Sequence, residues 1–396
     1  MSSQLISRSG DLARLVEEGY ALSVRGGALV VRDIPYLDSN RCVRRGTIIA
    51  ALELAGEITA APSTHWVGFI GGVPYGLDGR PLRGVGTTSG GAKRIAPDGA
   101  GGWLQADTTL CMQPAGREFA DYHELVTTYV AVLEGHARKL DSGATARTHR
   151  TVEVGKADSP FSYTDTASAR ASISDLNARL AIDSVGIVGL GGTGSYVLDL
   201  VAKTPVRSIH LYDDDLFLQH NAFRAPGAAT LDDLAARRAK VDHLAGIYSS
   251  MHKGIIPHRL KVDEGNVGML DKMDFVFICV DDPSARVMVS TRLAGRVPHV
   301  EVGMGLHAGD SGLFGLVRVS SSTPGEGARR DATHHHASGA RDNADPYRTN
   351  VQVADMNMLN AALAVISWKR LAGFYADEGG ERESVYVLGR NTLLNA

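Results

Sequence analysis

The sequence contains few cysteines, no long apolar run and no concentrated run of basic residues. Its three cysteines, Cys42, Cys111 and Cys279, are too few and too widely spaced for a disulfide framework or for paired CxxC zinc knuckles. No segment approaches the ~20 apolar residues that a membrane helix requires, and residues 1–15 lack the apolar core of a signal peptide. We therefore expect a cytoplasmic protein with no membrane segment.

The charge of the chain is nearly balanced. It has 41 Lys and Arg against 44 Asp and Glu, which gives a formal net charge of −3. Binding to nucleic acid requires a concentrated cationic surface, so nucleic acid is not an expected partner. The pattern GxxxxGK[ST] is absent from the sequence, which excludes a P-loop NTPase.

A polar, weakly periodic stretch over residues 141–165 predicts a linker between two domains. Short strands bounded by turns, followed by a helix, predict a small α+β accessory domain over residues 1–150. After the linker, short apolar strands alternate with helices. This pattern predicts an α/β domain with a Rossmann-like, mostly parallel sheet over residues 159–396.

The C-terminal part is predicted as a long loop followed by a helix. Residues 320–348 are polar, rich in glycine and aperiodic, which is typical of a loop. Residues 351–371 have helical periodicity, and Gly373 is expected to end the helix. The expected buried face of this helix consists of Met358, Leu359, Ala362, Val365 and Ile366.

The turn after the first strand of the second domain reads GLGGTG and fits the motif GxGxxG, with Gly189, Gly191, Gly192 and Gly194. Glycines permit a tight turn and let backbone N–H groups approach a phosphate at the N-terminus of the following helix. Asp213 ends the next strand, 24 residues after Gly189, where an acidic residue would bind ribose hydroxyls. This motif alone suits ATP or a nicotinamide or flavin dinucleotide, so an NAD-dependent oxidoreductase is an alternative.

Four further polar residues follow in a fixed order. Asn221 and Arg224 lie in HNAFR, Lys240 begins the next helix, and Asp281 follows the buried strand FVFICV. Together with GLGGTG and Asp213, this order resembles the ThiF/MoeB/E1-like (ubiquitin-activating) adenylyltransferase family over residues 185–286. A dehydrogenase has no use for the combination of Arg, Lys and Asp, so the oxidoreductase is disfavoured.

The resemblance implies an ATP-dependent, Mg²⁺-dependent adenylyltransferase. Its substrate would be the C-terminal glycine carboxylate of a ubiquitin-like or sulfur-carrier protein, activated as an acyl-adenylate. A carboxylate is already ionised at neutral pH and needs no general base. Catalysis would therefore rest on positioned cations that stabilise charge on the phosphate oxygens.

The resemblance also implies a role for each residue. Arg224 and Lys240 would neutralise the triphosphate, and Asp281 would hold Mg²⁺. Asp213 would fix the ribose, and Asp215 and Asn221 would complete the nucleotide site. As alternatives, Asp281 and Asp282 could cap a helix before Pro283, and Asp215 could be a turn residue only.

Arg170 precedes the first strand of the second domain by about one helix. Similar enzymes use an Arg from a comparable N-terminal element to reach the ATP of a neighbouring subunit. The resemblance thus implies a homodimer in which Arg170 assists catalysis; an ordinary surface arginine is the alternative.

The sequence departs from the family pattern because it lacks the CxxC pairs and any cysteine after Cys279, which is expected to be a buried core thiol. Three explanations follow. The protein stops at the adenylate, or Cys111 accepts the acyl group, or a loop serine forms an oxyester. The candidate serines are Ser320, Ser321 and Ser322, with His334, His335 and His336 nearby. The missing cysteine also keeps open a nucleotide-bound scaffold without catalysis.

Residues 1–150, including the stretch PSTHWVGFIGGVPYGLDGRPL, resemble an uncharacterised domain that is often fused ahead of ThiF-like domains in bacteria. Such fusions tend to belong to bacterial ubiquitin-like conjugation systems, some of them linked to phage defence. The resemblance implies a partner-binding or E2-like role for this domain, or recruitment of a separate E2-like protein.

Overall fold

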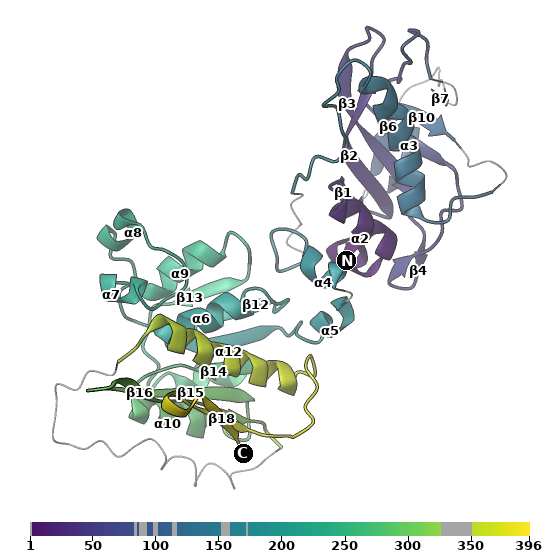
Figure 1. Ribbon diagram of the computed structural model, residues 1–396. Helices are drawn as coiled ribbons and strands as arrows, with labels where there is room; N and C mark the ends of the chain where they lie inside the picture. Colours follow the sequence, from purple (N-terminus) through teal and green to yellow (C-terminus); the bar gives the residue numbers. More distant parts are fainter. Residues whose placement is uncertain are drawn as a thin grey trace. The chain divides into compact units, whose positions relative to one another are not determined.

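The computed structural model describes residues 2–82, 85–86, 93–97, 102–112, 117–151, 159–171, 173–325 and 351–396. The chain divides into two compact units, Met1–Asp175 and Leu176–Ala396, each with its own hydrophobic core (Figure 1). Among the described helices, none is both long and apolar enough to cross a membrane. The two units are described separately below.

The first unit is built on a six-stranded antiparallel sheet with the strand order β1-β2-β3-β6-β10-β7, and helix α3 packs on β2. Helix α3 starts after Asp121, whose carboxylate accepts a hydrogen bond from Glu124 N at 2.7 Å. The predicted α+β class of this unit is confirmed. Its elements are α1 (Ser2–Arg8), α2 (Gly10–Glu17), β1 (Ala21–Arg25), β2 (Ala28–Leu37), β3 (Val43–Ala51), β4 (Leu54–Ala55), β5 (Ile58–Thr59), β6 (Trp66–Ile70), β7 (Val85–Gly86), β8 (Lys93–Pro97), β9 (Trp103–Ala106), β10 (Thr108–Cys111), α3 (Tyr122–Ala137) and α4 (Thr166–Arg170).

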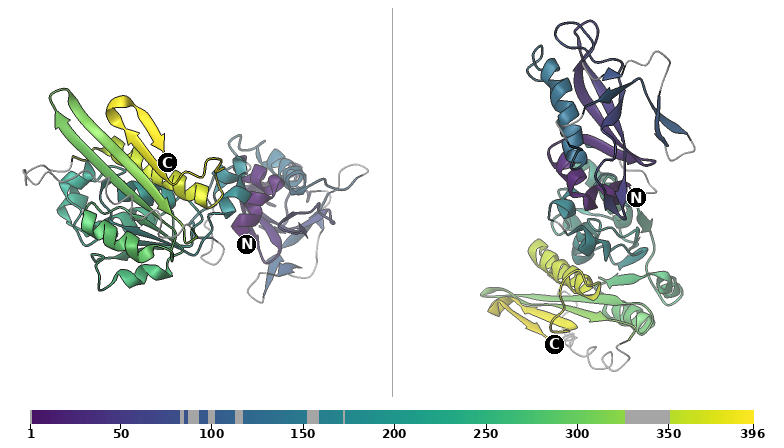
Figure 2. Two further views of the ribbon diagram at one scale, coloured as in Figure 1. Left: turned by 90° about the horizontal axis from the view of Figure 1, so that it is seen from below. Right: turned by 90° about the vertical axis from the view of Figure 1, so that its right-hand side faces the viewer.

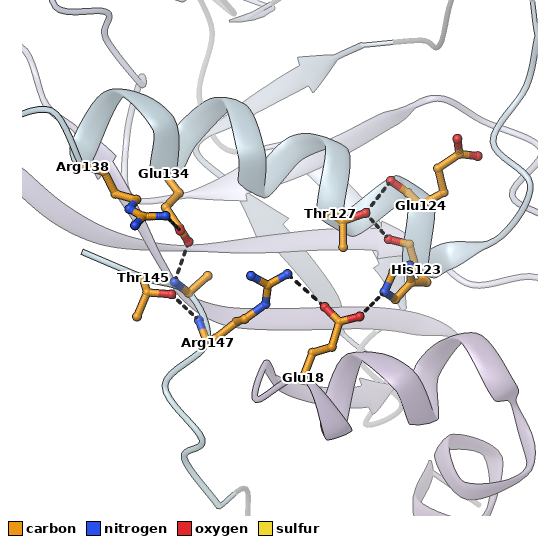
Figure 3. A network of polar contacts seen from close by, with 9 residues as sticks. Glu18, His123, Glu124, Thr127, Glu134, Arg138, Thr145 and Arg147 are labelled. Atoms are coloured by element: carbon orange, nitrogen blue, oxygen red, sulfur yellow. Dashed lines mark hydrogen bonds and ion pairs between the residues drawn. The ribbon is translucent and has the colours of Figure 1, made fainter. Parts of the chain in front are cut away.

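Glu18 follows α2 and joins two segments that are distant in sequence (Figure 3). His123 Nε2 lies 2.7 Å from one of its carboxylate oxygens, and Arg147 Nη2 lies 3.0 Å from the other. Burial opposes ionisation of Glu18, but the hydrogen bonds from His123 and Arg147 outweigh it and hold the pKa of Glu18 below its ordinary value. Glu134 of α3 accepts a further hydrogen bond from Ala146 N at 2.8 Å. The segment after α3 is thus fastened to both α2 and α3.

The second unit is built on an eight-stranded sheet with the order β13-β12-β11-β14-β15-β16-β17-β18. Four of its seven neighbouring pairs are parallel and three are antiparallel. The predicted mostly parallel, Rossmann-like sheet is confirmed. After α5 (Ser174–Ala178), its elements are β11 (Ser184–Val188), α6 (Gly192–Val201), β12 (Ser208–Tyr212), α7 (Gln219–Ala222), α8 (Leu231–Ala235), α9 (Lys240–Tyr248), β13 (Ile255–His258), the 3-10 helix η1 (Val267–Lys272), β14 (Phe275–Ile278), α10 (Pro283–Leu293), β15 (His299–Gly309), β16 (Gly312–Ser322), α12 (Ala354–Leu371), β17 (Glu383–Val387), the 3-10 helix η2 (Leu388–Arg390) and β18 (Thr392–Asn395).

Helices cover both faces of this sheet. Side chains from α6, α9 and α12 join one core cluster with the strands, whereas α10 and η1 contribute to the cluster on the opposite face. Helices α6 and α12 lie side by side (Figure 1). Trp368 of α12 is 2% exposed, and its ring meets those of Phe275 and Phe277 on β14. This layered arrangement places the carboxyl ends of β11, β12 and β14 at one edge, where α/β folds bind ligands.

The predicted loop over residues 320–348 is wrong at its start. Strand β15 extends to Gly309, and β16 pairs with it from His299↔Ser322 to Gly309↔Gly312. The two strands form a long hairpin, visible in green in Figure 2. The polar segment forms a strand because serine side chains do not prevent a ladder of main-chain hydrogen bonds.

The expected buried face of the C-terminal helix is also partly wrong. Val365 is buried, but Met358 is 52% exposed and Ile366 is 37% exposed. The buried face instead includes Asn357, Asn360, Ala361, Ala364 and Trp368. On this face Asn357 contacts the first turn of α6 and Trp368 packs against β14, so tertiary contacts set which side chains are buried.

Candidate active site

The glycine turn between β11 and α6 is sterically fixed at two positions and open at a third. Gly189 has φ +89°, and a Cβ atom there would lie 2.9 Å from the Cys279 carbonyl oxygen. A Cβ atom on Gly194 would lie 1.8 Å from the Gly189 carbonyl oxygen. At Gly191 a Cβ atom would enter open space, and no side chain caps α6 at this residue. The first turn of α6 is therefore suited to receive an anion.

Asp213 connects this turn to the basic residue Lys240. Its Oδ2 accepts a hydrogen bond from Leu190 N at 2.7 Å, and its Oδ1 accepts one from Asp215 N at 2.9 Å. Lys240 Nζ lies 3.4 Å from Asp213 Oδ1 and 2.5 Å from Asp215 Oδ2. Lys240 is 6% exposed at the first position of α9, so its ammonium group is held beside the turn.

Asn221 and Arg224 form an NxxR element, and the segment just before it pairs with the segment leading into α9. Phe217 N donates to Arg238 O at 2.8 Å, and Lys240 N donates to Asp215 O at 2.9 Å. Within α7, Asn221 Oδ1 accepts from Leu218 N at 2.9 Å, which leaves Asn221 Nδ2 buried without an acceptor. Arg224 Nε is also buried without an acceptor. Unsatisfied buried donors are costly, and an anionic ligand would satisfy them.

Asp281 and Asp282 differ in role although they are adjacent. Asp282 is the N-cap of α10, and its Oδ1 accepts from Ser284 N at 2.8 Å. Asp281 lies one residue earlier and is exposed at the carboxyl end of β14. The helix-cap alternative therefore belongs to Asp282, and Asp281 is free of that role.

Arg286 of α10 supports the chain just before Asp281. Its Nη2 donates to Val280 O at 3.1 Å, and its Nε lies 3.9 Å from Glu301 Oε1. Glu301 also accepts from Arg318 Nη2 at 2.8 Å. Burial lowers the pKa of Arg286 from its ordinary value, while the charges of Glu301 and Asp281 act in the opposite direction.

One group of three carboxylates among the described residues could hold a metal ion. Asp213, Asp214 and Asp215 offer oxygens within 4.8 Å of one another, and Asp281 does not belong to this group. Mg²⁺ is commonly held by one or two carboxylates together with substrate phosphates and waters. A single carboxylate from Asp281 is compatible with that chemistry, so its role as metal ligand stays a prediction.

Several predicted residues belong to the first unit or lie outside the described residues. Arg170 ends α4, which packs on α1 and α2 of the first unit, and its side chain lies outside the described residues. The predicted helpers of a loop nucleophile also lie outside them, namely His334, His335 and His336. Their roles stay predictions.

The candidate acyl acceptors differ in accessibility. Ser320, Ser321 and Ser322 lie in strand β16, so the prediction that they belong to a loop is wrong. Ser321 is 7% exposed, and its hydroxyl donates to Arg382 O at 3.3 Å. Cys111 is exposed at the end of β10. Burial raises the pKa of Cys279 to about 12, while the charge of Arg286 acts in the opposite direction.

The sequence interpretation missed Asn357, which lies on α12 and is fully buried. Its Oδ1 accepts a hydrogen bond from Thr193 Oγ1 in the first turn of α6 at 3.0 Å. The available signal was a pair of asparagines, Asn357 and Asn360, one helical turn apart in an otherwise apolar helix.

These features define an α/β domain in which a glycine turn, an acidic strand end and basic residues meet at the carboxyl ends of parallel strands, the edge where such folds bind ligands. The chain belongs to the ThiF family, whose model matches residues 166–366, just over half of the chain. A second model, domain of unknown function (DUF6791), matches residues 10–166.

The solved structures similar to this chain include MccB and PaaA. E. coli MccB with ATP is 16% identical over 56% of this chain and 65% of MccB, with a TM-score of 0.44. E. coli MccB with MccA-N7isoASN is 16% identical over 56% of this chain and 66% of MccB, with a TM-score of 0.47. PaaA is 15% identical over 68% of this chain and 84% of PaaA, with a TM-score of 0.46. The chain thus spans slightly less than two thirds of the first MccB structure. No curated protein sequence matches the chain.

The glycine turn predicts a large loss of stability for one alanine substitution and a small loss for another. Gly194→Ala should lower the free energy of unfolding by about 3 kcal/mol or more, because its Cβ would overlap the Gly189 carbonyl oxygen. Gly191→Ala should cost under about 1 kcal/mol, because its Cβ enters open space. Urea denaturation followed by circular dichroism measures both. Equal losses in the two variants would contradict the described turn.

The three cysteines differ in exposure and in thiol pKa, which predicts that they are alkylated selectively. At pH 8 only about 1 in 10,000 of the Cys279 thiols would be ionised at a pKa of about 12, so this residue should stay unlabelled by iodoacetamide. The exposed Cys42 and Cys111 should react in the native protein. Mass spectrometry of peptides measures the labelling, and urea-denatured protein labelled at all three positions is the control. Labelling of native Cys279 at the rate of Cys111 would contradict a buried Cys279 thiol with a raised pKa.

Proposed function

We propose that the second unit binds ATP and adenylates the C-terminal carboxylate of a ubiquitin-like or sulfur-carrier protein. The observation that carries this proposal is the pair of buried donors on the NxxR element, Asn221 Nδ2 and Arg224 Nε, which have no acceptor in the part of the chain that the structure describes. They accompany an α6 N-terminus that no side chain caps. Membership of the ThiF family supports the same conclusion.

The residues fit a nucleoside triphosphate by charge and by hydrogen bonding. The N–H groups of the first turn of α6 suit a phosphate, and the open space at Gly191 lets one approach. Arg224 and Lys240 supply positive charge. Asp215 is the carboxylate closest to the ammonium group of Lys240, and its side chain is 70% exposed. Water can therefore solvate this carboxylate when a phosphate binds the ammonium group. Asp213 offers its remaining lone pairs to ribose hydroxyls.

The proposed reaction is an in-line displacement. A carboxylate oxygen of the partner forms a bond to the α-phosphorus of ATP, and the bond from that phosphorus to the bridging oxygen breaks. The electron pair leaves with pyrophosphate, and the product is the acyl-adenylate. Arg224 and Lys240 stabilise the charge that develops on the phosphate oxygens, and no group has to remove a proton.

Magnesium would be held by Asp281 and by the phosphates themselves, and when bound it would supply further neutralisation of the departing pyrophosphate. Arg286, which donates to Val280 O, fixes the backbone just before Asp281, whereas Asp282 caps α10. Neither of these contacts uses the carboxylate of Asp281.

The same proposal has three further parts. They are the identity of the partner, a homodimer in which Arg170 reaches the neighbouring site, and a bacterial conjugation system linked to phage defence. They rest on the family resemblance. Cys111 in the first unit is exposed, so transfer of the acyl group to this residue is a testable variant of the proposal. Release of the adenylate to a partner's thiol is the version that requires no acceptor in this chain.

Exchange of labelled pyrophosphate into ATP tests the reaction. The whole chain, Mg²⁺ and a candidate partner ending in a free glycine should support exchange, because adenylation is reversible. Asp281→Ala should reduce the rate at least about 100-fold, since a group aimed at the transferring phosphate would be lost. Removal of the partner's last residue should abolish exchange.

Asp282→Ala is the matched control, because it removes the neighbouring carboxylate. It should keep the exchange rate and lower the stability by about 1 kcal/mol through loss of the helix cap. Tight ATP binding without exchange for any partner would favour a nucleotide-bound scaffold. Equal rates in Asp281→Ala and wild type would contradict the assignment of Asp281.

A further inference from the structure

Helix α12 places the buried side-chain amide of Asn357 in contact with the glycine turn. Asn357 is 0% exposed, and its Oδ1 accepts a hydrogen bond from Thr193 Oγ1 at 3.0 Å. A Cβ atom on Gly192 would lie only 2.1 Å from Asn357 Nδ2, so the amide occupies the space that a side chain at this position would fill. Both contacts fall on the first turn of α6.

The amide of Asn357 is oriented with Oδ1 toward the hydroxyl of Thr193. Because a hydroxyl donates to Oδ1, Nδ2 is directed toward Gly192, where it has no acceptor among the described residues. A buried donor without an acceptor costs about 1–3 kcal/mol. An apolar side chain branched at Cγ, such as leucine, would avoid this cost, so stability alone does not account for an asparagine at position 357.

Asn360 provides an internal comparison on the same helix. It is 1% exposed, and it likewise has one amide atom without a partner, Oδ1. Its Nδ2 donates to Gly303 O of β15 at 3.3 Å. The two asparagines thus have similar burial and chemistry, but only Asn357 holds the glycine turn.

We propose that Asn357 is a positioning residue for the phosphates of the nucleotide. It sets the placement of Gly192 and Thr193, whose N–H groups belong to the anion-binding turn, and it acts through that turn without touching the ligand. A displacement of about 1 Å in a binding group can cost on the order of 100-fold in rate. The inference rests on the proposed function, because it assumes that this turn binds ATP.

Replacement of the amide by a branched apolar side chain tests the proposal in the whole chain. Asn357→Leu should raise the Kd for ATP about tenfold, with a parallel rise in the KM for ATP in pyrophosphate exchange and a smaller change in kcat. Its thermal unfolding temperature should change little, because the substitution removes the unsatisfied Nδ2 but also takes the acceptor away from the Thr193 hydroxyl. Isothermal titration calorimetry and thermal unfolding provide the two readouts.

Asn360→Leu makes the same chemical change one turn along the helix and should leave the Kd for ATP unchanged. Thr193→Val, a change of similar shape, removes the hydroxyl that orients Asn357 and should raise the Kd several-fold. If the two residues act as one unit, the double variant Thr193→Val/Asn357→Leu should bind ATP no more weakly than Asn357→Leu. Thr193→Val also provides the test if leucine at position 357 prevents folding.

The outcomes separate this inference from the proposed function. Wild-type Kd in both Asn357→Leu and Thr193→Val, with ATP bound normally by wild type, would overturn the inference alone. So would equal losses of affinity and stability in Asn357→Leu and Asn360→Leu, since a structural role predicts that pattern. Failure of the wild-type chain to bind ATP would overturn both.

Discussion

The carboxylate of Asp213 ties three parts of the second unit together. It accepts hydrogen bonds from Leu190 in the glycine turn and from Asp215 after β12, and it lies within 3.4 Å of Lys240 at the start of α9. These segments come from three different places in the sequence. A parallel sheet brings its strand ends to one edge, and this single side chain then sets the spacing between turn and cation. The relative placement of the glycine turn, the NxxR element and the α9 lysine depends on that spacing.

The sequence predicted this edge of the sheet because its constraints are local. Gly189 and Gly194 are required where a Cβ atom would meet backbone within the turn or on the neighbouring strand, so their spacing is visible in the sequence. The alternation of apolar strands and helices likewise predicted the parallel part of the sheet. Asp281 and Asp282 could not be separated from sequence, because either could cap a helix; the hydrogen bond to Ser284 assigns the cap to Asp282.

The features that were missed depend on contacts between distant segments. The polar residues Ser320–Ser322 gave no local signal for a strand, and their pairing with His299–Glu301 is a tertiary effect. Helical periodicity predicted α12 but misjudged its buried face, because that face is set by contacts with distant segments, such as those of Asn357 with α6 and of Trp368 with β14. Asn357 followed from neither propensity nor motif, since its function in this account comes from Gly192 and Thr193, more than 160 residues earlier.

The central claim is that this edge of the sheet recognises the triphosphate of ATP and not a dinucleotide. Isothermal titration of the whole chain with a non-hydrolysable ATP analogue and Mg²⁺, compared with NADH, tests it most directly. The account predicts saturable binding of the ATP analogue that weakens strongly in Arg224→Ala, and no binding of NADH. Tight binding of NADH, with no binding of the ATP analogue, would contradict it.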